Sequence, residues 1–123
     1  MATLADRVYD NGLTVLDTEA NRMDICSTEP TSYAEATSTY TLGNSTSLSI
    51  GAPQDRTGGG REVVVAAISD GSVTGTGTAA YYAIVDTINS RLLATGSLSA
   101  SQSVTSGNTF TLTSVTIGIP DPA

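Results

Sequence analysis

The chain has 123 residues, a formal net charge of −7 and only 14% charged residues, and it contains no histidine, lysine or tryptophan. These absences exclude a histidine-based triad, histidine-ligated zinc, a Schiff-base lysine and a P-loop lysine. The acidic balance argues against DNA or RNA as a partner, because nucleic-acid affinity comes largely from neutralising phosphates. We therefore expect a protein that is not an enzyme and uses no cofactor or metal.

Length and cysteine usage favour one compact domain. A chain of this size buries about two-thirds of its unfolded surface, which supports one hydrophobic core. We predict a single domain over 1–123, with an N-terminal helical segment or arm at 1–20 and a β domain at 21–123. Cys26 is the only cysteine, so no intrachain disulfide exists. It is either a buried small hydrophobe or one half of an intermolecular disulfide.

The start of the chain does not read as a targeting segment. It has no apolar run typical of a signal peptide, and no stretch in the chain reaches the length of a membrane span. We expect a protein made in a cytoplasm, with no membrane partner.

Charge is concentrated in the first third. Residues 1–35 hold seven acids against two arginines, whereas residues 71–119 hold only Asp86 and Arg91. Serine and threonine occupy 35 positions. The nearly uncharged segment 71–119 must therefore be kept soluble by the hydroxyl groups of its serines and threonines, or be covered by other subunits.

The first predicted element is a short helix. Thr3 and Asp6 fit the [ST]-x-x-[DE] start signal, in which both side chains satisfy free amide hydrogens of the first turn. Leu4 and Val8 follow at helical spacing. Gly12 weakens the prediction, since glycine costs about 1 kcal/mol relative to alanine in a helix.

A strand is predicted next, over 22–27. Met23 and Ile25 alternate onto one face, and Asp24 and Cys26 share the other. Such period-two alternation is typical of a strand.

The segment that follows is mixed. Residues 33–39 fit a helical turn or an irregular excursion. Leu48 and Ile50 alternate with serines as in a strand. Pro53 and three consecutive glycines indicate a flexible loop over 51–60.

Strands dominate from residue 61 onward. The apolar run 63–68 predicts a buried strand, ended by a turn at Asp70–Gly71. Residues 79–85 and 91–98 predict an antiparallel hairpin joined by the polar segment 87–90.

In the last predicted strand, the apolar residues switch from one face of the strand to the other. Phe110 and Leu112 lie on one face, but the apolar residues after them have the opposite parity: Val115, Ile117 and Ile119. Such a change implies one extra residue, so we predict a β-bulge near 113–114. The fold class is mainly β, a single antiparallel β-sandwich or small barrel with a short N-terminal helix.

Five stretches of the sequence resemble one group of proteins. They are residues 24–37, 40–43, 69–79, 85–93 and 114–122, and together they resemble small virion proteins of tailed bacteriophages. Some of these resemble capsid decoration, or cement, proteins. The resemblance implies a structural role without catalytic residues.

What the resemblance implies about function is specific. It implies a protein that decorates and stabilises the outer capsid surface of the virion and is made in the bacterial host cytoplasm. The partner is the major capsid protein or another virion protein, and the protein forms a homo-oligomer, with a trimer favoured.

The interface candidates come from three features of the sequence. The helix and the loop 51–60 are predicted docking elements, arginines can pair bidentately with shell carboxylates, and tyrosine is enriched at interfaces. The candidates are Leu4, Arg7, Val8, Arg56, Arg61, Tyr81 and Tyr82.

Two alternatives remain open. One is a tail, collar or fibre-attachment component. The other is a receptor- or carbohydrate-binding β-sandwich. Such sites usually expose aromatic residues, and this chain has no tryptophan and only five tyrosines and Phe110. A small hydrolase is the weakest alternative, because no nucleophile has a matching base.

Overall fold

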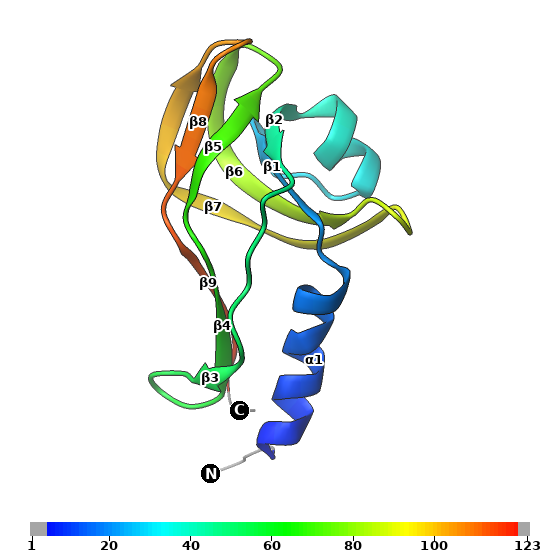
Figure 1. The fold of residues 1–123 in the computed structure, drawn as a ribbon, viewed down its shortest axis with the longest axis vertical. Helices are drawn as coiled ribbons and strands as arrows, with labels where there is room; N and C mark the ends of the chain where they lie inside the picture. The colour runs from blue at the N-terminus through cyan, green and yellow to red at the C-terminus, as the bar shows by residue number, and fades with distance from the viewer. Residues whose placement is uncertain (1–4, 121–123) are drawn as a thin grey trace. The chain divides into compact units, whose positions relative to one another are not determined.

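The computed structural model of the protein describes residues 5–120. Strands make up 49% of it, arranged in antiparallel sheets with one N-terminal helix, which confirms the predicted mainly β class (Figure 1). The chain forms two compact units. Among the described residues, unit 1 contains 5–19, 49–67 and 113–120, and unit 2 contains 20–48 and 68–112. The single domain over 1–123 stays a prediction.

Unit 1 is a helix lying against a small antiparallel sheet (Figure 1). The sheet has three strands in the order β3-β4-β9. The helix buries one stripe at helical spacing, and β4 buries two valines beneath it: Tyr9, Leu13 and Leu16, with Val63 and Val65. The elements are α1 (Asp6–Glu19), β3 (Gln54–Asp55), β4 (Arg61–Val65) and β9 (Val115–Ile119).

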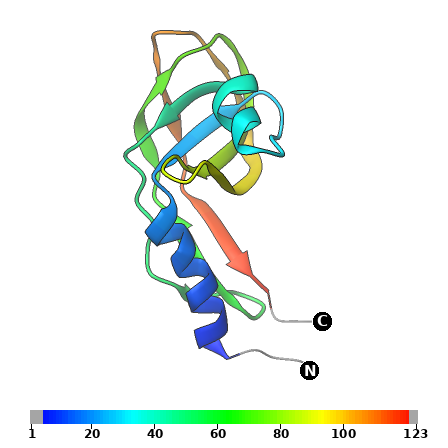
Figure 2. The same ribbon diagram turned by 90° about the vertical axis from the view of Figure 1, so that its right-hand side faces the viewer.

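Unit 2 is a six-stranded antiparallel sheet in the order β7-β6-β1-β2-β5-β8, curled into a half-barrel. A short π-helix, η1 (Glu35–Thr39), packs against β1 and β2 (Figure 2). The strands are β1 (Arg22–Cys26), β2 (Thr41–Ser45), β5 (Ile68–Val73), β6 (Gly77–Asp86), β7 (Arg91–Val104) and β8 (Thr109–Leu112).

Strand β1 is the centre of unit 2 and confirms the predicted strand there. It pairs with β2 on one side and β6 on the other. The residues Met23–Cys26 are all buried, so both faces of the strand are covered. Cys26 packs in a cluster with Ala36, Ala83 and Val85.

The hairpin of β6 and β7 is also confirmed. Asp86 pairs with Arg91 across a four-residue turn. The Asp86 carboxylate accepts the backbone N–H groups of Ile88 and Asn89, at 3.0 and 3.3 Å. Ser90 closes the turn at a φ of 55°.

The prediction for 63–71 is partly wrong. The apolar run divides between β4, which ends at Val65, and β5, which begins at Ile68 in the other sheet. Asp70 and Gly71 form no turn but lie inside β5, where the pairing with β8 is irregular. The glycine serves packing, because a Cβ on Gly71 would lie 2.2 Å from the Phe110 ring.

The segment 40–60 also differs from its prediction. The strand is β2, at Thr41–Ser45, whereas Ile50 makes only an isolated bridge to Val65. The loop 51–60 contains β3, which forms a hairpin with β4. Its glycines Gly58–Gly60 all have positive φ, a backbone conformation that glycine adopts without strain. Residues 33–39 do form a helical excursion, which includes η1.

The predicted β-bulge at 113–114 is wrong. The parity change instead marks a break between two strands, because β8 belongs to the six-stranded sheet and β9 to the three-stranded one. A chain that leaves one sheet for another can reset which residues face inward, as an inserted residue does. Pro120 follows β9 directly.

We expect Gly71→Ala to destabilise the protein by about 1–3 kcal/mol, because the added methyl group must displace the buried Phe110 ring. Gly75→Ala is the matched control, since a Cβ there meets Leu42 at an ordinary 3.5 Å. Urea unfolding measures both free energies. Equal midpoints for the two variants would contradict the packing role of Gly71.

Candidate functional site

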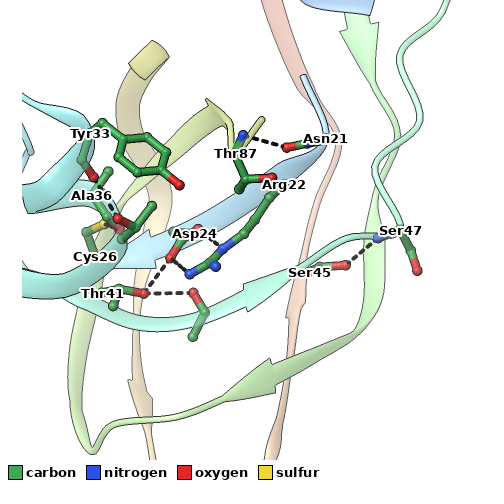
Figure 3. A network of polar contacts seen from close by, with 12 residues as sticks. Asn21, Arg22, Asp24, Cys26, Tyr33, Ala36, Thr41, Ser45, Ser47 and Thr87 are labelled. Atoms are coloured by element: carbon green, nitrogen blue, oxygen red, sulfur yellow. Dashed lines mark hydrogen bonds and ion pairs between the residues drawn. The ribbon is translucent and has the colours of Figure 1, made fainter. Parts of the chain in front are cut away.

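The most enclosed polar group of unit 2 is the carboxylate of Asp24 on β1 (Figure 3). Arg22 donates to it twice, from Nε to Oδ1 at 2.7 Å and from Nη2 to Oδ2 at 2.8 Å. The hydroxyl of Thr41 on β2 donates to Oδ2 at 2.7 Å. Because period-two alternation puts Arg22 and Asp24 on one face of β1, the ion pair forms along a single strand.

This network is structural in character. The hydrogen bond with Asp24 raises the pKa of Arg22, although burial works in the opposite direction. Both carboxylate oxygens of Asp24 are engaged in hydrogen bonds. Among residues 5–120, no buried side-chain nitrogen or oxygen lacks a hydrogen-bond partner.

Cys26 lies on the same face of β1 as Asp24. Its thiol is buried and donates to the carbonyl oxygen of Ala36 at 3.7 Å. Burial, with a smaller contribution from the negative charge of Asp24, raises the pKa of the thiol to about 12. The thiol is therefore protonated and shielded, as in the small-hydrophobe alternative, and its sulfur is not accessible for an intermolecular disulfide.

A second charged cluster joins the elements of unit 1 through Arg61 on β4. Arg61 Nε donates to Asp10 Oδ1 of α1 at 3.0 Å, and Nη1 donates to Asp55 Oδ1 of β3 at 2.7 Å. Asp6 lies at 3.9 Å from Nη1. The hydrogen bonds to Asp10 and Asp55 raise the pKa of Arg61 above its ordinary range. The guanidinium thus fastens α1 to the hairpin.

The arginines and helix residues predicted as interface candidates differ in how exposed they are and in which contacts they make. Leu4 lies outside the described residues, whereas Arg7 and Val8 are exposed on α1. Arg56 turns back onto its own hairpin, donating from Nη1 to the Gly59 carbonyl oxygen at 3.0 Å. Arg61 is held by its ion pairs. To reach a shell carboxylate, either Arg56 or Arg61 would first lose these contacts.

The two tyrosines, Tyr81 and Tyr82, are adjacent on β6, so strand alternation points them to opposite faces. Tyr81 is half-buried against the Cys26 cluster. Tyr82 is only 7% exposed, and a Cβ on Gly96 of β7 would lie 2.6 Å from its hydroxyl. The Tyr82 ring thus fills the space that Gly96 leaves within the chain, and its role as an interface residue stays a prediction.

Two exposed apolar residues were missed by the sequence analysis. Ile88, at the tip of the β6–β7 turn, is 83% exposed, and Val15 on α1 is 43% exposed. A large aliphatic residue between two polar turn residues was an available signal for Ile88. For Val15 the available signal was its spacing of seven residues from Val8, because that spacing places both valines on one side of a helix.

Within residues 5–120, no group of three or more histidine, cysteine, aspartate or glutamate side chains could hold a metal ion. No helix in that part of the chain is both long and apolar enough to cross a membrane.

We expect Arg22→Met to cost about 3 kcal/mol of unfolding free energy, because it leaves the buried Asp24 carboxylate without its cation. Arg7→Met, at an exposed position of α1, is the control and should change stability little. Chemical denaturation measures both. The double variant Arg22→Met/Asp24→Leu should recover part of the loss, and a further loss would argue against an uncompensated buried charge.

The thiol of Cys26 predicts a pH dependence. A pKa raised by folding stabilises the folded state below the unfolded pKa, and this contribution is lost as pH rises toward the folded value. Between about pH 8 and pH 11, the wild type should lose about 2 kcal/mol more stability than Cys26→Ala. Urea titrations at each pH measure the difference. Parallel pH profiles for the two proteins would refute the effect.

Comparison with known proteins identifies no relative. No protein-family model matches the chain, and no curated protein or solved structure matches it.

Proposed function

We propose that the protein is a non-enzymatic structural protein of a phage virion that decorates and stabilises the outer capsid surface. The observation that carries a contact function is the placement of its exposed apolar side chains. Ile88, Val8 and Val15 stand on a defined turn and a helix, whereas the buried ionic groups are used in internal pairs. The assignment to a phage capsid rests on the sequence resemblance.

The β6–β7 turn has the features of an anchor. The side-chain amide of Asn89, with the backbone N–H groups of Asn89 and Ile88, lowers the pKa of Asp86 and holds its carboxylate ionised in the turn. These bonds fix the backbone that presents Ile88. An apolar side chain on a preorganised turn can enter a pocket at little conformational cost.

The long strand β7 supplies a polar surface suited to repeated contact. Its exposed residues include the alternating serines Ser97, Ser99, Ser101 and Ser103. From 92 to 104 the strand carries no charge. Hydroxyls can both donate and accept, so such a surface can match a protein partner without pairing charges.

The partner that we propose is the major capsid protein or another virion protein. Arg7, exposed on α1, is the candidate cation for a shell carboxylate. The homo-oligomer, with the trimeric order that the resemblance implies, belongs to the same proposal.

The proposal is tested with empty heads and purified protein. We expect Ile88→Asp to weaken binding to heads by at least about tenfold, because it places a charge in an apolar pocket. Thr46→Asp, which adds the same charge at the exposed bend after β2, is the matched control.

Copy number in virions separates the structural alternatives. A decoration protein should be present in hundreds of copies by quantitative mass spectrometry. A few copies per particle would indicate a tail, collar or fibre-attachment component, and absence of binding to heads together with glycan binding would indicate a carbohydrate-binding protein.

A further inference from the structure

Strand β9 of unit 1 has one open side. It pairs with β4 along its whole length without a register shift, and among residues 5–120 no strand pairs with its other side. Open strand edges in natural proteins are usually blunted by lysine, proline or bulges, because they offer unpaired backbone groups to other chains. The sequence of β9, VTIGI, contains none of these devices.

The backbone bonds of β4 show which groups of β9 are open. The carbonyl oxygen of Val64 accepts the N–H of Gly51 at 3.0 Å, so the Val64 peptide groups point away from β9. By strand alternation, Val63 and Val65 point toward β9 and pair with Ile117 and Val115. Thr116 and Gly118 therefore direct their N–H and C=O groups to the open side.

Apolar surface lies directly above this edge. Val115, Ile117 and Ile119 are each half-buried, and their partners on β4 include the buried Val63 and Val65. A Cβ on Gly12 of α1 would lie 3.6 Å from Ile119 Cδ1, which places that side of the helix over β9.

The exposed valines of α1 lie on the same side of the helix as Gly12, the side over β9. At about 100° per residue, Val8 and Val15 lie within about 60° of Gly12, both in the direction away from the buried stripe. They are 56% and 43% exposed. The apolar flank of α1 thus continues past the last strand of the sheet.

We propose that two copies of this chain pair through β9, antiparallel across a two-fold axis. The two sheets then join into one continuous sheet, with both α1 helices on one face. The register centred on Ile117 is self-complementary. Thr116 of one copy faces Gly118 of the partner subunit, and Gly118 of the first copy faces Thr116 of the partner subunit. Every open N–H and C=O of β9 then meets a partner, and Val8 and Val15 lie beside the joined strands.

The distribution of charge favours a second copy of this chain as the partner at the open edge of β9. The chain carries a net charge of −7, so copies repel unless they meet at a neutral surface. Strand β9 has no charged residue, and two cations lie near it. A Cβ on Gly118 would lie 2.9 Å from Arg56 Cδ, and Arg61 on β4 pairs with Asp10 of the nearby helix, although it is shared with Asp55 and Asp6. An isologous contact also needs a surface that complements itself, which the symmetric register provides.

Substitution by proline tests the pairing. Thr116→Pro removes an N–H that points to the open side, so it spares the β4 ladder but blocks the partner strand. We expect the dissociation constant of the dimer to rise at least about tenfold in sedimentation velocity. Thr111→Pro is the matched control, since the Thr111 carbonyl accepts from Gln102 and so also points away from β5.

A second variant keeps the test independent of any strain from proline. Val15→Lys, at an exposed helix position, should weaken the dimer without unfolding the chain. Hydrogen exchange should show protection of the Thr116 and Gly118 amides that increases with protein concentration. Circular dichroism verifies the fold of each variant.

The overturning results are distinct. A wild-type monomer at about 100 μM would refute the pairing. So would a dimer or trimer whose mass is unchanged by a folded Thr116→Pro or by Val15→Lys. The two-fold dimer differs from the trimeric order that the resemblance implies, and the mass in sedimentation velocity distinguishes the two. The proposal stands apart from the capsid function, because self-association is measured on the isolated protein and head binding separately.

Discussion

The buried carboxylate of Asp24 is the constraint on which unit 2 depends. It sits on β1, the strand between β2 and β6, and a charge in that position is tolerated only when fully paired. Arg22 supplies the opposite charge from the same strand, and Thr41 supplies a hydroxyl from the neighbouring one. The pairing of β1 with β2 is therefore tied to a polar contact as well as to backbone bonds.

Much of unit 2 could be predicted from local pattern, because its central elements obey simple alternation. The faces of β1 and the hairpin of β6 and β7 followed from period-two spacing and a polar turn. Strand β2 could not be predicted, since Gly43 and Asn44 are poor strand residues. Glycine is required at position 43 by the close approach of strand β5, because a Cβ on Gly43 would lie 2.5 Å from the Ser72 carbonyl oxygen.

The break between β8 and β9 shows a second limit of local reasoning. The parity change at 113–114 was a real signal, but a bulge and a change of sheet produce the same pattern. Only the pairing partners, β5 for one strand and β4 for the other, distinguish them. The candidate site was limited in the same way. The arginines and Tyr82 were chosen by residue type, whereas exposure, which depends on tertiary packing, adds Ile88 and Val15.

The order of segments in unit 1 has a consequence for synthesis. Its sheet joins β4, which ends at Val65, to β9, which begins at Val115, so the intervening chain holds most of the strands of unit 2. A nascent chain emerging from the ribosome presents α1 and β4 long before β9. Until then, the edge of β4 stays unpaired, and closing so long a loop is entropically easier once the intervening strands are already compact. Completion of unit 1 is thus a late event in the biogenesis of the protein.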